Sequence, residues 1–212
     1  MTPANADGDP AAGLIRYDDG RVGCWWAGDD PLYRAYHDDE WGRPVTDDVR
    51  LLEKLCLEGF QAGLAWITIL RKRERFREVF AGFDPEVVAA FGADDIDRLL
   101  ADPGIIRHRG KIEATIGNAR AYLQLVGDDA GSVTTLSELV WSFAPTAADR
   151  PARLDFASLS VLASTPQSVA LSRELKRRGF RFVGPTTVYA FMQAMGLVND
   201  HLDGCDTRAA CG

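Results

Sequence analysis

Two pairs of possible metal ligands stand at opposite ends of the chain. Twelve residues separate Cys24 from His37 near the start, and three separate His201 from Cys205 near the end. Zinc binds thiolate and imidazole ligands in a closed tetrahedron, and the i, i+4 spacing of the second pair suits one helical turn or a tight loop. Four protein ligands would make the site structural, because a catalytic zinc keeps one position open for water. Spacing alone also allows unrelated buried thiols and surface histidines.

The composition predicts an intracellular globular protein. The chain has 212 residues, of which 46% are hydrophobic, and four cysteines. This is enough apolar material for a substantial core and too few cysteines for a disulfide scaffold, so we expect the reducing cytoplasm. No run approaches about 18 apolar residues, and the start lacks a basic region followed by an apolar stretch. We therefore expect neither secretion nor a membrane partner.

The expected organisation is one helical domain between two tails. Residues 1–20 are expected to be a disordered tail, 21–206 the domain, and 207–212 a C-terminal tail. A second region of low order is expected over 127–151, although 136–143 could add a short helix around Trp141.

Helices are the elements expected within the domain. Capping residues and apolar periodicity predict them over 47–58, from 84, from 94, and over 111–125, 168–178 and 185–195. The run 66–70 is apolar and partly β-branched, but it is too short and isolated to found a sheet. The predicted fold class is therefore all-α, a compact helical array.

Basic residues gather on a few segments although the net charge is -7. They lie at 71–77, 107–111 and 173–181. Grouped basic residues suit contact with phosphates whatever the total charge. Taken singly, each such run is more often a solvated helix face.

The strongest local motif spans residues 175–187. A helix is expected to end at Gly179, an apolar hairpin follows, and Gly184 with Pro185 starts the next helix. This looks like a helix-hairpin-helix, in which the glycine lets the backbone approach a phosphate and the amides of the new helix face it. The usual pattern has a glycine where this chain has Phe182, so an ordinary packed helical turn is the alternative.

Longer stretches resemble the 3-methyladenine DNA glycosylase I family. They are Asp30 to Gly42, Glu58 to Ile67, Gly104 to Ile112, and Gly179 to Gly184 followed by Asn199 to His201. The resemblance diverges only over 127–160 and implies an all-helical member of the helix-hairpin-helix glycosylase superfamily.

The resemblance also implies a structural Zn2+ held by Cys24, His37, His201 and Cys205. Cys211 could compete as a ligand, and of the two we favour Cys205. It further implies an enzyme that removes 3-methyladenine from alkylated DNA.

Such an enzyme must flip the base out of the duplex and stack it on aromatic rings, which Tyr33, Tyr36 and Trp66 could supply. Glu58 lies at the edge of a buried helical stripe, where a carboxylate needs a partner. The resemblance implies that it accepts from the adenine amino group, whereas by position alone it could be a helix-end glutamate half in water. We expect it to act in recognition and charge stabilisation, because a cationic base needs no strong general acid to leave. The residue that activates water stays open.

The expected contacts to double-stranded DNA lie in two turns, at Gly63, Leu64, Lys176, Arg181 and Gly184. We expect a monomer that binds alkylated DNA and releases free 3-methyladenine. A noncatalytic zinc-stabilised DNA-binding protein would share the hairpin and the zinc but would need no base pocket. A zinc hydrolase would need a metal-bound water.

Overall fold

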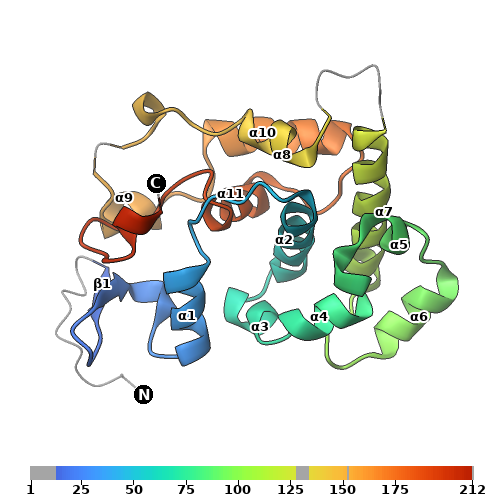
Figure 1. Cartoon of the computed structure of the whole chain (residues 1–212), viewed down its shortest axis with the longest axis horizontal. Helices are drawn as coiled ribbons and strands as arrows, with labels where there is room; N and C mark the ends of the chain where they lie inside the picture. Colours follow the sequence, from blue (N-terminus) through green and yellow to red (C-terminus); the bar gives the residue numbers. More distant parts are fainter. Residues whose placement is uncertain (1–12, 128–133, 152, 212) are drawn as a thin grey trace. The chain divides into compact units, whose positions relative to one another are not determined.

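The computed structural model describes residues 13–127, 134–151 and 153–211, which fold mainly into helices (Figure 1). The chain divides into two compact units. The first takes the described parts of Met1–Pro44, Pro145–Ala163 and Met192–Gly212, and the second takes those of Val45–Ala144 and Ser164–Phe191. Both ends of the chain therefore belong to one unit, and the middle of the chain makes the other.

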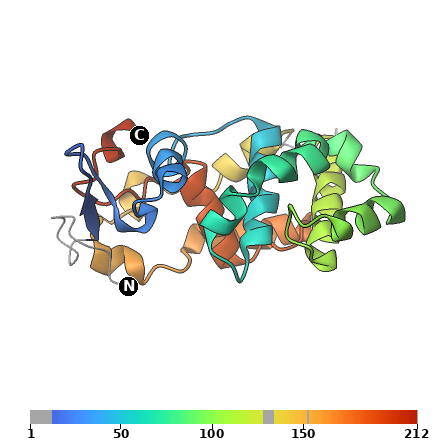
Figure 2. The same cartoon turned by 90° about the horizontal axis from the view of Figure 1, so that it is seen from below.

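The first unit contains a small sheet and short helices. Strand β1 (Leu14–Arg16) pairs antiparallel with β2 (Val22–Cys24). The helices are η2 (Trp25–Ala27), α1 (Pro31–Asp39), η4 (Ala147–Asp149), α9 (Phe156–Ser160) and η5 (Arg208–Ala210). Their core brings Cys24 together with Leu154, Leu202 and Cys205. The blue N-terminal strands and the red C-terminal segment accordingly lie side by side in Figures 1 and 2.

Strand β1 corrects two expectations. The described residues are mostly helical rather than purely so, and the tail expected over 1–20 is too long, because residues 14–16 are paired. Residues 1–12 of that tail lie outside the described part. Strands of three residues are too short to show a period, so the sequence carried no usable signal for this pairing.

The C-terminal tail expected over 207–212 also belongs to the fold as far as it is described. Thr207 and Cys211 are buried, and η5 lies between them. Burial of these side chains fixes the segment in the first unit.

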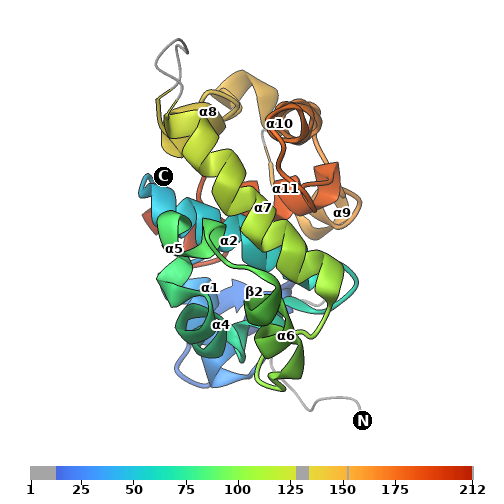
Figure 3. The same ribbon diagram turned by 90° about the vertical axis from the view of Figure 1, so that its right-hand side faces the viewer.

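The second unit is built around α2 (Asp48–Gln61), which is buried at every residue from Leu51 to Phe60. The other helices are α3 (Trp66–Leu70), α4 (Arg73–Val79), η3 (Ala81–Phe83), α5 (Pro85–Ala89), α6 (Ala93–Ala101), α7 (Arg109–Val126), α8 (Leu136–Trp141) and α10 (Pro166–Arg177). The boundary between the units falls within α11 (Pro185–Ala194). Helix α7 packs beside both α2 and α5 (Figure 3). A helix buried all round is a core element, so α2 can hold polar groups away from water.

The predicted capping residues start the helices. Asp47 and Asp84 each accept a backbone N–H of the first helical turn. The start expected at Asp94 lies one residue earlier, at Ala93. None of the described helices combines the length with the apolar composition that a membrane span requires.

The short helix expected around Trp141 is present as α8. The carboxylate of Asp48 accepts from the N–H groups of Leu136 at 3.0 Å and Ser137 at 2.8 Å. The indole N–H of Trp141 donates to the carbonyl of Val45 at 2.9 Å. These bonds attach α8 to the start of α2.

Candidate metal centre and base-binding site

The four predicted metal ligands converge in the first unit. Cys24 ends β2, His37 lies on α1, and His201 and Cys205 lie in the segment after α11. All four side chains are buried, and their donor atoms lie within 4.8 Å of one another. The described chain therefore contains a possible metal-binding cluster formed from both of its ends.

The distances between these donor atoms match the edges of a zinc tetrahedron. The Nδ1 of His201 lies 3.2 Å from the Nε2 of His37, and the Sγ of Cys205 lies 3.5 Å and 3.6 Å from these two nitrogens. The Sγ of Cys24 lies 3.9 Å from the Nδ1 of His201. Zinc bonds of about 2.0–2.1 Å to nitrogen and about 2.3 Å to sulfur give N–N edges of about 3.3 Å and N–S edges of about 3.6 Å. The residues present fit a four-coordinate zinc.

Hydrogen bonds outside the cluster orient both imidazoles. The Nδ1 of His37 donates to Asp38 Oδ1 at 2.7 Å, and the Nε2 of His201 donates to the carbonyl of Trp41 at 3.1 Å. A carboxylate and a carbonyl only accept, so the protons lie on these nitrogens and the two facing nitrogens carry lone pairs. The N–H of Cys24 donates to the Nε2 of His37 at 3.3 Å, so that lone pair has a partner within the protein. The tautomers are compatible with a bound cation.

The two thiols of the cluster differ in acidity. Hydrogen bonding from Cys24 and from the two imidazoles lowers the pKa of Cys205, whereas the same pairing and burial raise the pKa of Cys24. The N–H of Leu202 donates to the Sγ of Cys24 at 3.4 Å, which stabilises a thiolate. Cys211 is outside the cluster, and its Sγ lies 3.7 Å from the carbonyl of Trp41.

Three aspartates interleaved with the ligands hold their segment in place. Asp200 is buried and pairs with Arg150. Asp206 accepts from the N–H of Val22 at 2.7 Å, and Asp203 accepts from another backbone N–H of the first unit. These contacts give each carboxylate a structural role and identify none of them as the group that activates water.

Tyr33 and Tyr36 lie on the same helix as the ligand His37. Their rings stack with centroids 6.5 Å apart. The ring of Trp26 lies 5.2 Å from Tyr33 and 5.1 Å from His37. Trp26 fits a core role by its type alone, but it is only half-buried and links the tyrosines to the metal ligands. Its position two residues after the candidate ligand Cys24 was the sequence signal that could have placed it beside the metal ligands.

Glu58, in the second unit, has the partner that its burial demands. Its Oε1 lies 2.8 Å from the Nζ of Lys54, which is one turn earlier on α2 and also buried. Burial raises the pKa of Glu58, and the charge and hydrogen bond of Lys54 oppose that rise. With 4% of the residue exposed, a helix-end glutamate half in water is excluded.

Trp66 completes a buried group that we call the carboxylate cluster, Lys54, Glu58 and Trp66. The indole is buried at the start of α3, and the Nζ of Lys54 lies 3.2 Å from its ring centroid. An ammonium over an indole face is a cation–π contact. The cluster thus combines a carboxylate, a cation and an aromatic ring within one unit.

The turn between α2 and α3 presents Gly63 and Leu64. Gly63 has a φ of 84°, and Leu64 is 43% exposed. The Nζ of Lys111 donates to the carbonyls of Phe60 at 2.8 Å and Ala62 at 2.7 Å. Lys111 therefore faces inward and fixes this turn, so its expected part in a phosphate-binding run is wrong.

Helix α10 ends in a Schellman motif. The N–H of Gly179 donates to the carbonyl of Lys176, and the N–H of Phe180 donates to that of Leu175, both at 3.0 Å. Gly179 has a φ of 91°, which favours glycine. Helix α11 then begins at Pro185, as expected.

Phe182 takes the conformation that a glycine would take in the usual pattern. Its φ is 57°, and it packs so tightly on α2 that a Cβ on Gly59 would lie 3.2 Å from its own Cβ. The ring of His108 lies 6.3 Å away. Asn118 holds both backbone groups of Arg181, accepting from the N–H at 2.7 Å and donating to the carbonyl at 3.2 Å. Tertiary contacts therefore impose the turn without the second glycine.

The side chains of Lys176 and Arg181 are exposed, and neither forms a salt bridge within the described residues. Arg75 and Arg77 of the earlier run each contact two carboxylates instead. Uncompensated positive charge is therefore available on the hairpin segment.

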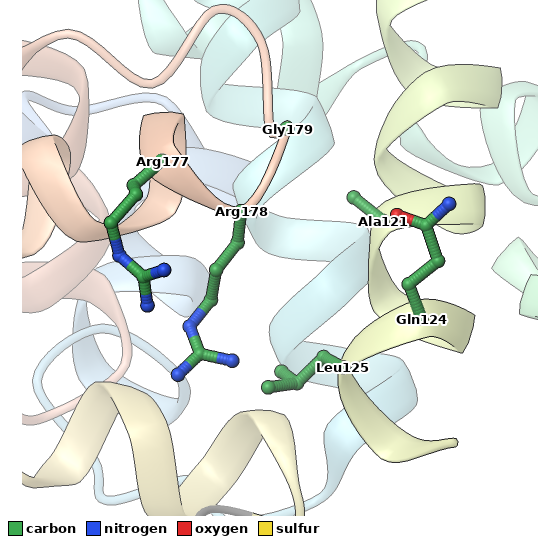
Figure 4. A pocket seen from close by; sticks show the side chains of 6 residues that line it. All are labelled: Ala121, Gln124, Leu125, Arg177, Arg178 and Gly179. Atoms are coloured by element: carbon green, nitrogen blue, oxygen red, sulfur yellow. The ribbon is translucent and has the colours of Figure 1, made fainter. Parts of the chain in front are cut away.

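A hollow between α7 and α10 contains none of the predicted site residues (Figure 4). Its lining residues are Ala121, Gln124, Leu125, Arg177, Arg178 and Gly179. Hydrogen bonds from the two arginines lower the pKa of Glu174 to about 2. Glu174 pairs with both guanidiniums and offsets one of their two positive charges.

Comparison with known proteins shows the family. A model of the methyladenine glycosylase family matches residues 26–209. DNA-3-methyladenine glycosylase 1 of Escherichia coli strain K12 is 55% identical over 183 residues, which cover 86% of this chain and 94% of that protein. A crystal structure of 3-methyladenine DNA glycosylase I shares 50% identity with a TM-score of 0.79, covering 87% of this chain and 98% of its own. A tyrosine-to-phenylalanine variant in complex with 3-methyladenine shares 36% identity with a TM-score of 0.74, covering 86% and 95%. The chain belongs to the methyladenine glycosylase family.

Proposed function

We propose that this chain is a DNA repair enzyme that hydrolyses the N-glycosidic bond of 3-methyladenine in alkylated double-stranded DNA. The carboxylate cluster carries the proposal, because Glu58 and Trp66 share one buried site. A flipped purine needs a ring to stack on and an acceptor for its amino group, and these side chains offer both. Relatives named for this activity support it, as does a related enzyme solved with 3-methyladenine.

The expected chemistry needs little acid catalysis. Methylation at N3 gives the purine a positive charge, and cleavage between C1′ and N9 returns the electron pair to the ring, so the base leaves neutral. Water then adds to the oxocarbenium-like sugar. Glu58 would accept from the adenine amino group and stabilise positive charge, while Trp66 stacks the base. Tyr33 and Tyr36, on α1 of the first unit, stay the sequence-based candidates for further stacking rings.

The proposal includes a structural zinc. Cys24, His37, His201 and Cys205 would hold it, and the ion would cross-link the two ends of the chain within the first unit. Four protein ligands leave no position for a reactive water, which separates this site from that of a zinc hydrolase.

Helices α10 and α11 with their turn are proposed to bind DNA as a helix-hairpin-helix. The amides at Gly184 and the start of α11 would face a phosphate, and Lys176 and Arg181 would add charge beside it. Gly63 and Leu64, in the exposed turn before α3, would contact the duplex too. We expect a monomer.

Chromatography of bases released from methylated duplex DNA tests this function. The wild-type chain should release 3-methyladenine, and Glu58→Gln should release it more slowly. Glu78→Gln changes an exposed glutamate of the same unit and should match the wild type. Binding to the DNA without any base release would favour a noncatalytic DNA-binding protein.

A further inference from the structure

Lys54 places a cation inside the proposed base-binding site. Its ammonium lies 2.8 Å from the Oε1 of Glu58 and 3.2 Å from the ring centroid of Trp66. Contact with a carboxylate and with an aromatic ring are the two interactions that a cationic purine would make here. The buried site therefore already contains one positive charge, tethered to α2.

On the basis of the proposed function, we infer that Lys54 is a specificity-determining residue that disfavours the cationic lesion base relative to the neutral released base. It does so by compensating Glu58 and by repelling a second cation at the same two groups.

The selectivity follows from the charge balance of the cluster. Glu58 alone would attract any cationic purine, but with Lys54 the pair carries no net charge. Both side chains are buried, so water screens the repulsion between the ammonium and a cationic base only weakly. The repulsion is relieved when the bond from C1′ to N9 breaks, because the electron pair neutralises the base. Lys54 should therefore weaken binding of the lesion and assist departure of the base.

The charge of Lys54 also affects the pKa of the Glu58 carboxyl. Lys54 opposes the burial that raises the pKa of Glu58, and so keeps an acceptor available for an amino group. Lys54→Met removes the charge while keeping a long apolar stem, but it leaves the buried carboxylate of Glu58 without its partner and should therefore lower stability. Lys54→Gln is the second variant, because its neutral amide can still donate a hydrogen bond to Glu58.

A pair of purines that differ in charge measures the effect. One is 3-methyladenine, neutral in mildly alkaline buffer, and the other is 3,9-dimethyladeninium, in which a methyl group replaces the sugar and the charge is permanent. By calorimetric titration, Lys54→Met should shift the affinity ratio toward the cation by about tenfold or more. It should also bind lesion DNA more tightly and excise more slowly in a single turnover. Lys72→Met, at a lysine that donates to the carbonyl of Pro103 outside the cluster, should leave the ratio unchanged.

The outcomes distinguish the role of Lys54 from the assignment of the base site to Glu58 and Trp66. If Glu58→Gln weakens binding of 3-methyladenine while Lys54→Met leaves the affinity ratio unchanged or shifts it toward the neutral base, the role of Lys54 is overturned and the base site stands. If neither variant changes the affinity for either purine, the base binds elsewhere. Both the role of Lys54 and the assignment of the base site to Glu58 then fall.

Discussion

The Cys/His cluster of the first unit and the carboxylate cluster of the second bury polar groups by different means. In the Cys/His cluster, His37 and His201 meet across a sequence separation of 164 residues. In the carboxylate cluster, Lys54 and Glu58 are four residues apart on one helix. The first arrangement requires both ends of the chain to be folded, whereas the ion pair of the second requires only α2 in its buried position. Loss of a ligand in the first unit should therefore leave α2 and its ion pair in place.

Removal of a metal ligand should have the largest effect on stability. Cys24→Ser should release zinc and lower the free energy of unfolding by several kcal/mol, as is typical of a structural metal. Cys56→Ala, at a buried cysteine of the second unit, is the matched control and should keep one zinc per chain. Metal analysis, thermal melting and hydrogen exchange measure these effects.

Hydrogen exchange decides whether the two sites are independent. In Cys24→Ser, amides of β2 and α1 should lose protection while those of α2 keep most of theirs. Equal loss of amide protection in both units would show that the two sites are not independent. If Cys24→Ser keeps its zinc and its melting temperature, other residues bind the metal.

The same contrast between local and long-range contacts explains what could be predicted from the sequence. Asp47 and Asp84 cap the very next turn, so the helix starts were visible. The inward direction of Lys111 was not, because its partner carbonyl on Phe60 lies 51 residues earlier and only folding brings the two together. The left-handed Phe182 is hidden for the same reason. The β1 and β2 strands pair locally, and they are hidden because three residues are too few to show a period. The partnership of Lys54 with Glu58 was visible in their i, i+4 spacing and was missed.

The hairpin turn is also held by contacts between residues far apart in the sequence, here the hydrogen bonds between Asn118 and Arg181. Asn118→Ala removes both bonds to the backbone of Arg181 and should lower stability by about 1–3 kcal/mol. It should also weaken binding to damaged and undamaged duplexes alike. Asn118→Asp keeps the acceptor for the N–H but buries a charge and turns an acceptor toward the carbonyl of Arg181, so it should destabilise the turn as well. Denaturant titration and duplex binding check both variants, and unchanged DNA affinity in Asn118→Ala would mean that DNA binds elsewhere.

Single surface charges should have the smallest effects. Lys176→Ala and Arg181→Ala should each reduce the slope of log affinity against log salt by about 1 if each contacts a phosphate. Arg177→Ala is the matched control, because Glu174 already compensates that guanidinium. Binding isotherms at several salt concentrations provide the slopes. If Lys176→Ala and Arg181→Ala keep the wild-type slope, the contacts to DNA lie instead on the basic segments near residues 71 and 107.

Titration of free 3-methyladenine into the wild-type chain, Glu58→Gln and Trp66→Ala tests the central claim most directly. Glu58→Gln should weaken binding and slow excision by about 10–1000-fold, because one charge-stabilising contact is lost. Trp66→Ala should lose about 1–3 kcal/mol of binding free energy as its stacking surface disappears. Glu78→Gln should bind like the wild type. Wild-type affinity in both cluster variants, with melting curves that show intact folding, would contradict the assignment of the base site to Glu58 and Trp66.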